Sequence, residues 1–101
     1  MRMMMKVAIP TDAGNKSVAD GSLPRVMGQF IERWKPEGSY FTTAGDGQRC
    51  AYFFVDLPDV ADIPSMAEPF FMQLHANVIF QPAMNAADMA AGVGKAMQQH
   101  G

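Results

Sequence analysis

The sequence is poor in cysteine, in basic charge and in long apolar runs. Its single cysteine, Cys50, excludes an internal disulfide and a zinc site built from several thiolates. A chain of this kind suits a reducing compartment, and we expect a cytoplasmic protein. The net charge is −2 and lysine and arginine form no cluster, which disfavours nucleic-acid binding. No apolar run approaches the ~20 residues of a membrane-spanning helix, so we predict no membrane association.

What remains is the composition of one globular domain. Of the 101 residues, 49% are hydrophobic and 18% are charged. A chain of this length buries roughly 60–70% of its unfolded surface, which is enough for a single core. The ten methionines are spread along the sequence, and we interpret them as flexible core filler. We therefore expect one domain over residues 1–101.

The clearest local pattern is a β-hairpin within residues 38–57. Two runs, 40–43 and 50–55, are rich in the aromatic and β-branched residues that favour strands. Between them lies Gly45-Asp46-Gly47, a sequence typical of a tight hairpin turn. The pattern predicts two antiparallel neighbouring strands.

Before the hairpin, the pattern predicts a strand over 4–9, a loop over 10–14 and helical spacing over 15–35. Gly21 and Pro24 interrupt the helical spacing. The alternatives are one kinked helix, or a short turn followed by a helix that Ser22 caps and in which Pro24 occupies the first turn. The helix is expected to place Val18, Leu23, Met27, Phe30, Ile31 and Trp34 near one apolar face.

After the hairpin, the pattern predicts a helix from Asp62, a strand over 76–82 and a short C-terminal helix from Asn85. The first of these helices has an apolar face formed by Ile63, Met66, Phe70, Phe71 and Leu74. Pro69 lies inside it and predicts an irregularity. Asn85 and Asp88 resemble a capping box. Gly92 and Gly94 predict that the last helix frays.

This order of elements predicts an α+β fold, the ferredoxin-like βαββαβ plait with a short C-terminal helix. Right-handed crossovers place two helices on one face of a four-stranded antiparallel sheet with strand order 4-1-3-2. We assign Val7, Ile9, Phe41, Phe53, Val55, Val78 and Phe80 to the helix-covered face. The remaining face, which we call the open face, then carries Lys6, Ala8, Tyr40, Thr42, Cys50, Tyr52, Phe54, Asn77, Ile79 and Gln81.

The open face is too apolar for a freely solvated surface and too polar for a dry core. Surfaces of this kind mark partners or ligands, and a second copy packed face to face is the simplest cover, so we expect a homodimer. The candidate ligand-binding residues on it are Tyr40, Thr42, Tyr52, Asn77 and Gln81. Either they line a pocket that orients a small, mostly apolar ligand, or they are interface residues with satisfied hydrogen bonds.

Two further side chains, those of His75 and Cys50, could act in acid–base or nucleophilic chemistry. His75, just before the last strand, is either an acid, base or ligand-binding residue, or a loop histidine that bonds locally. Cys50 is either a nucleophile or a small buried hydrophobe, and its neighbour Arg49 should point to the opposite face. His75 and His100 are too far apart in the sequence to indicate a metal site. The sequence also has no glycine-rich phosphate-binding motif. We therefore predict neither a metal nor a cofactor.

The order of elements, the length and the aromatic and polar open face resemble the dimeric α+β barrel superfamily. This superfamily includes muconolactone-isomerase-like proteins, small antibiotic-biosynthesis-type monooxygenases and stress-responsive barrel proteins. The strings GSYFTTAGDGQRCAYFFVDLPD, IPSMAEPFF and VIFQPAMNAADM look like those of a bacterial family of similar length and unknown function. The resemblance covers residues 4 to about 90. It implies a homodimer whose two sheets enclose a cavity.

The resemblance transfers no catalytic residue, because no catalytic motif of an enzymatic member is recognisable here. We expect a binding or interaction module for a small molecule or partner. The alternative is a cofactor-free isomerase or monooxygenase-like enzyme that acts on a small aromatic or polyketide-like compound. In that case Tyr40, Tyr52 and Asn77 would orient the compound, and His75 would be the base available at neutral pH.

Overall fold

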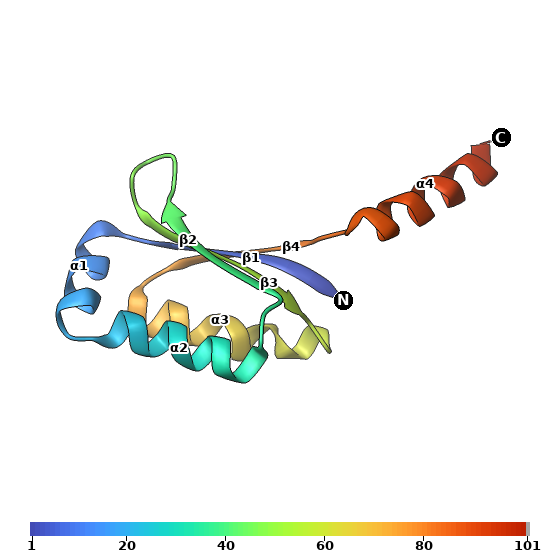
Figure 1. Cartoon of the computed structure of the whole chain (residues 1–101). Coiled ribbons are helices and arrows are strands. Elements are labelled where there is room, and N and C mark those ends of the chain that lie inside the picture. Colours follow the sequence, from blue (N-terminus) through green and yellow to red (C-terminus); the bar gives the residue numbers. More distant parts are fainter. Residues whose placement is uncertain (101) are drawn as a thin grey trace.

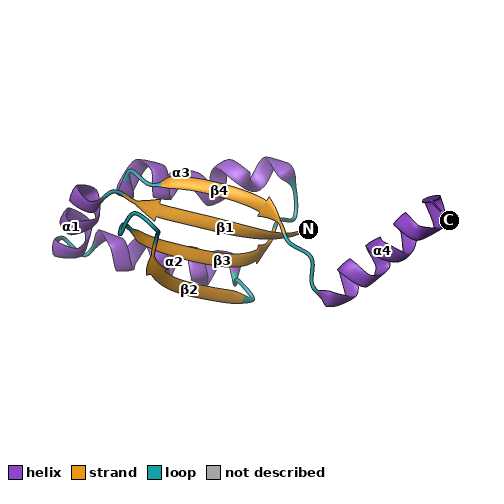
Figure 2. Ribbon diagram, turned by 90° about the horizontal axis from the view of Figure 1, so that it is seen from above, coloured by secondary structure: helices purple, strands orange, loops and turns teal. Residues whose placement is uncertain are grey.

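The computed structural model describes residues 1–100, and the side chains of residues 1–99. Its elements are β1 (Arg2–Ile9), α1 (Thr11–Ala19), α2 (Ser22–Trp34), β2 (Gly38–Thr43), β3 (Arg49–Asp56), a 3₁₀ turn (Val60–Asp62), α3 (Ile63–Leu74), β4 (Asn77–Pro82) and α4 (Ala86–His100). The fold is α+β, with one antiparallel four-stranded sheet in the order β2-β3-β1-β4. This is the expected 4-1-3-2 order read from the opposite edge. Helices α2 and α3 lie side by side beneath one face of the sheet (Figures 1 and 2).

Alternation along the central strand β1 divides the side chains between the two faces. Its odd-numbered residues from Met3 to Ile9 are buried, and the even-numbered residues between them are half-buried. In the register, Val7 lies beside Ala51 and Val78, and Lys6 lies beside Tyr52 and Ile79. Because neighbouring residues in paired strands share a face, this register confirms the predicted division of the strands into two faces. Phe41 is the exception in burial: it lies on the face assigned to the helices but is 59% exposed.

The core lies between the sheet and the two helices. Three aromatic rings meet at its centre: Phe30 of α2, Phe53 of β3 and Phe70 of α3. Their centroids are 4.6 Å apart for Phe30 and Phe53, 5.3 Å for Phe30 and Phe70, and 6.1 Å for Phe53 and Phe70. Tilted rings at these separations are favourable, so one strand and two helices are held together by a single cluster.

The region before the hairpin differs from the prediction in several respects. Residues 11–19 form helix α1 where a loop was expected over 10–14. Gly21, with φ of 79°, then separates α1 from α2, so the second alternative is correct in the break before Ser22 and in placing Pro24 in the first turn of α2. It is wrong in expecting only a short turn before the break. Ser22 is not the cap: its backbone N–H instead donates to the carboxylate of Asp20 at 2.8 Å. Val18 is exposed because it belongs to α1 and not to the apolar face of α2.

Helix α3 keeps most of its predicted apolar face. Met66, Phe70 and Leu74 are fully buried, and Ala67, which the prediction missed, is buried with them. Phe71 is 41% exposed, so its assignment to the core was wrong. Pro69 lies inside the helix without ending it.

Helix α4 is longer than expected and projects away from the rest of the molecule (Figures 1 and 2). The predicted capping box is present: the Asp88 N–H donates to the Asn85 side chain at 2.8 Å, and the Asn85 N–H donates to the Asp88 carboxylate at 3.0 Å. The predicted fraying at Gly92 and Gly94 was wrong, because the helix continues through both. A fixed first turn compensates for part of the ~1 kcal/mol that each glycine costs relative to alanine.

The carboxyl group of Asp88 makes the start of α4 sensitive to acid. Its pKa lies below the ordinary value of 3.8, first because it accepts the backbone N–H of Asn85 and next because Arg2 donates to it at 2.8 Å. A lowered pKa in the folded state stabilises the fold above pH 3.8, and this contribution is lost as the pH falls through the folded-state pKa. We therefore expect amide protection in the first turn of α4 to fall below pH 3.8 in an NMR titration. An Asp88 carboxyl that titrates at or above 3.8 would contradict this.

Candidate functional site

The open face is organised in three rows that run across the four strands. Taken in the order β2, β3, β1, β4, the rows are Thr42-Cys50-Ala8-Asn77, Tyr40-Tyr52-Lys6-Ile79 and Gly38-Phe54-Met4-Gln81. The register therefore brings five predicted site residues, Tyr40, Thr42, Tyr52, Asn77 and Gln81, onto one surface. Two of them lie on each edge strand and Tyr52 lies between, so polar groups frame an apolar and aromatic centre.

The middle row has the most distinctive chemistry. Tyr40 is 63% exposed and Ile79 is 52% exposed, while Tyr52 and Lys6 between them are half-buried. The ammonium of Lys6 lies 6.0 Å from the centroid of the Tyr52 ring, at the limit of a cation–π interaction. Tyr40 meets the ring of Phe54 edge to face at 6.4 Å. The row offers aromatic surface next to one positive charge.

The open face is hollowed at both ends. The turn that joins β2 and β3 rises on the side of this face (Figure 1). Its residues Ala44, Asp46 and Gln48 border a depression of about 510 Å³ that Lys6 and Asn77 also line. This depression reaches over the β4 edge to Val78 and to Phe71 of α3. A second depression of about 280 Å³ lies at the other end of the strands and is lined by Tyr40, Phe54, Arg2 and Met84 among others. The first depression has the volume of a small-molecule pocket, and the second is just below that range and can take a side chain of a partner.

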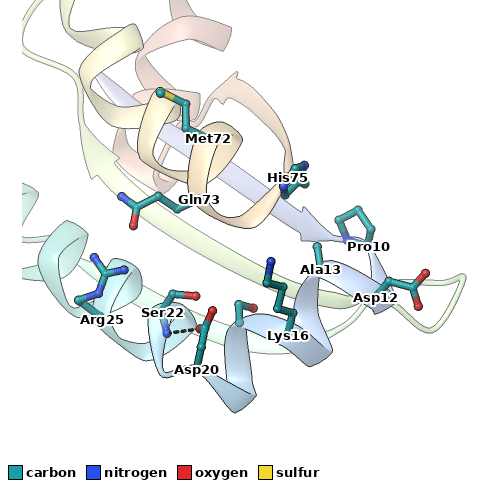
Figure 3. A pocket seen from close by; sticks show the side chains of 11 residues that line it. Pro10, Asp12, Ala13, Lys16, Asp20, Ser22, Arg25, Met72, Gln73 and His75 are labelled. Atoms are coloured by element: carbon teal, nitrogen blue, oxygen red, sulfur yellow. Dashed lines mark hydrogen bonds between the residues drawn. The ribbon is translucent and has the colours of Figure 1, made fainter.

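His75 lies elsewhere, in a groove of about 710 Å³ between α1, the start of α2 and the end of α3 (Figure 3). It is exposed and ends α3 in the left-handed conformation, with φ of 52°. The backbone N–H of His75 donates to the carbonyl of Phe71 at 3.1 Å. The backbone N–H of Ala76 donates to the carbonyl of Phe70 at 3.2 Å. These bonds satisfy carbonyls at the helix end, so the contacts of His75 fit a local structural role. The structure does not bring it together with the other five predicted residues.

The charges around His75 are balanced. Lys16 of α1 and Arg25 of α2 face the same groove as Asp12 and Asp20. Hydrogen bonds from Ser22 lower the pKa of Asp20, and the positive charges of Lys16 and Arg25 lower it further. Asp20 is therefore ionised at neutral pH and pairs locally, and the groove has no excess of either charge to select an ion.

Cys50 lies on the open face but is only 3% exposed. Its neighbour Arg49 points to the opposite side of the sheet, where its side chain lies against Gly14 of α1. A reactive cysteine needs access and a nearby positive charge. The position of Cys50 instead fits the small buried hydrophobe.

The sequence reasoning missed two residues at the edge of the site, Arg2 and Met84. Arg2 was missed because the first strand was expected to begin at residue 4, whereas β1 begins at Arg2. The alternation of Arg2 with Met4, Lys6 and Ala8 was the signal that could have found it. Met84 follows β4 in a stretch without periodicity, and no local pattern indicates it.

Among the described residues, no three histidine, cysteine, aspartate or glutamate side chains gather to form a metal site. Within the same part of the chain, no helix is both long and apolar enough to cross a membrane. Comparison of the chain with models of protein families, with curated proteins and with solved structures finds no match.

Proposed function

We propose that this protein is a homodimeric binding module with a ferredoxin-like, dimeric α+β barrel architecture. Two copies pack with their open faces toward each other and hold a small, mostly apolar molecule between the sheets. The observation that carries the proposal is the row Tyr40-Tyr52-Lys6-Ile79, which places exposed aromatic and aliphatic groups on a sheet face without a helix over it.

The need for a second copy follows from this exposure. Tyr40 and Ile79 stand on the two edge strands, with half-buried Met4, Tyr52 and Phe54 between them. A contiguous patch of this kind is uncommon on a monomeric protein. A two-fold axis lets the same patch cover itself, and most soluble homo-oligomers are built in this way.

The kind of ligand follows from the groups that line the face. The depressions at its two ends would be closed over by the second sheet and become enclosed. Tyrosine rings supply flat apolar contact, while the amides of Asn77 and Gln81 and the tyrosine hydroxyls supply directed hydrogen bonds. Lys6 adds one cation on each copy. A small aromatic acid has the matching chemistry.

The alternative, a cofactor-free isomerase or monooxygenase-like enzyme, has less support. It needs a base among the residues that orient the substrate. His75 was the candidate, and it lies in the groove beside α1. We therefore favour binding over catalysis.

The test combines sedimentation with a thermal-shift screen of small aromatic acids and their neutral analogues. We expect a dimer at micromolar protein, and stabilisation of about 2.7 kcal/mol by a ligand at a hundred times its Kd. Tyr52→Ala should abolish the shift, and Met72→Ala, an exposed position on α3, should leave it unchanged. A stable monomer that none of the compounds stabilises would contradict the proposal.

A further inference from the structure

The C-terminal helix α4 carries an apolar stripe that is fully accessible. Met89, Val93 and Met97 are 56%, 55% and 64% exposed. Their spacing of four residues places them on one side of the helix. The opposite side carries Asp88, Ala91, Lys95 and Gln98. Every described side chain from 86 to 99 is exposed, so this amphipathic helix lies uncovered against water.

A helix of this kind gains little from its own sequence. It has 15 residues, near the length at which isolated helices in water are only marginally stable. Gly92 and Gly94 each lower its stability by about 1 kcal/mol relative to alanine. Most helices are stabilised by packing of their apolar side, and for α4 that packing must come from outside the described fold.

The start of α4 is connected to the sheet by a backbone hydrogen bond and by an ion pair at the surface. The Ala83 N–H donates to the carbonyl of Arg2 at 3.0 Å and continues the β1–β4 ladder. Arg2 then pairs with Asp88 at 2.8 Å and also with Glu37, next to β2. The first turn of the helix therefore contacts Arg2, and Arg2 in turn contacts Glu37, two positions far from α4 in the sequence.

From this contact, α4 extends beyond the end of the sheet and rises on the side of the open face (Figure 1). The chain measures 57 × 28 × 19 Å and its radius of gyration is 16.1 Å. A compact chain of this length has a radius of gyration of about 13 Å. The molecule therefore has the shape of a compact body with a protruding arm, on the side where the proposed partner lies.

We propose that α4 is an exchanged arm, a proposal that rests on the homodimer described above. The helix of each copy packs Met89, Val93 and Met97 against β2 of the second copy. The edge strand β2 suits this role because Tyr40 on its open face and Phe41 on its other face are both largely exposed. An uncovered apolar edge strand is an aggregation hazard that proteins normally cover with another element.

The dimensions support the exchange. At 1.5 Å per residue α4 is about 22 Å long, and the six residues of β2 span about 20 Å. Four strands about 4.8 Å apart give the open face a footprint of roughly 400 Å². This is about half of the ~800 Å² that each partner buries in a standard interface. Each copy would also bury the apolar side of its own α4 and the β2 surface that receives the α4 of its partner. These two contacts would supply much of the remaining area.

Photocrosslinking of the full-length chain tests the exchange. We place p-benzoylphenylalanine at position 93, inside the stripe, or at position 91, on the opposite side of the same helix. Position 93 should give a covalent dimer whose crosslinked peptide contains residues of β2, and position 91 should give little. Covalent dimers through α4 of both copies, or crosslinks within one chain only, would overturn the exchange.

Charge substitutions give an independent measurement. In sedimentation, the double change Met89→Glu and Val93→Glu should raise the dimer dissociation constant roughly tenfold or more, and Ala91→Glu should leave it within about twofold. If the wild type is a dimer that the double change does not weaken, the exchange is wrong while the homodimer stands. If the wild type is a monomer, both proposals fail.

Discussion

Replacing Phe70 by alanine is expected to remove about 3–5 kcal/mol of the free energy of unfolding. The side chain is fully buried and its ring lies 5.3 Å from Phe30 and 6.1 Å from Phe53. Its loss opens a cavity where α2, α3 and β3 meet. A domain of this size is stabilised by only about 5–15 kcal/mol, so the variant should unfold at a much lower urea concentration.

The adjacent residue supplies a matched control. Phe71→Ala deletes the same atoms from the next position of α3, but Phe71 is 41% exposed and its loss leaves no enclosed cavity. We expect a loss of less than about 1 kcal/mol. Urea unfolding of both variants at one protein concentration measures the difference. Equal losses would mean that α3 packs on the sheet through a different side.

This pair also shows how far periodicity can resolve a core. Both phenylalanines fit the apolar spacing of α3, and adjacent residues on a helix lie 100° apart, so the spacing alone cannot say which one points inward. The packing of the helix on the sheet determines which phenylalanine is buried. Phe70 is the one whose ring packs against Phe53 of the sheet. Strands do not have this ambiguity. Their period of two places every residue on one face or the other, and the division of the sheet into two faces was predictable for that reason.

The helices at the two ends of the fold were harder to predict. Residues 11–19 have weak amphipathic spacing, with buried Gly14 and Ser17 where a core helix usually has larger apolar groups. Local patterns therefore favoured a loop over 10–14 and helical spacing only from residue 15. In α4 the capping box at Asn85 and Asp88 was recognisable, but the contact of Asp88 with Arg2, which is distant in sequence, was not.

The candidate site shows the same division between local and distant information. Five of the six predicted residues share the open face because their positions follow from strand alternation and register. The sixth, His75, was added to them because it precedes the last strand and is a base available at neutral pH. Its left-handed backbone ends α3 and turns the chain, so the side chain faces the groove beside α1. The resemblance to the dimeric α+β barrel superfamily stays a prediction.

The substitution Ile79→Lys should weaken the proposed dimer about a thousandfold. Ile79 lies directly beside Lys6 on the open face and is 52% exposed in the single chain. In a monomer the new lysine remains in water, and repulsion from Lys6 costs at most about 1 kcal/mol. In a face-to-face dimer the two-fold axis buries the added cation twice, and each unpaired buried charge costs several kcal/mol.

Met72→Lys is the matched control, since it adds the same charge at an exposed position of α3 in the helix layer. Sedimentation velocity over a range of concentrations gives the dissociation constants, and urea unfolding shows whether each variant is folded. We expect Ile79→Lys to be a folded monomer and Met72→Lys to remain a dimer. Lys6, Tyr52 and Ile79 form one row, so a dimer that tolerates Ile79→Lys would have to use another surface. That result would contradict the proposal that the open face is the dimer interface and the binding site.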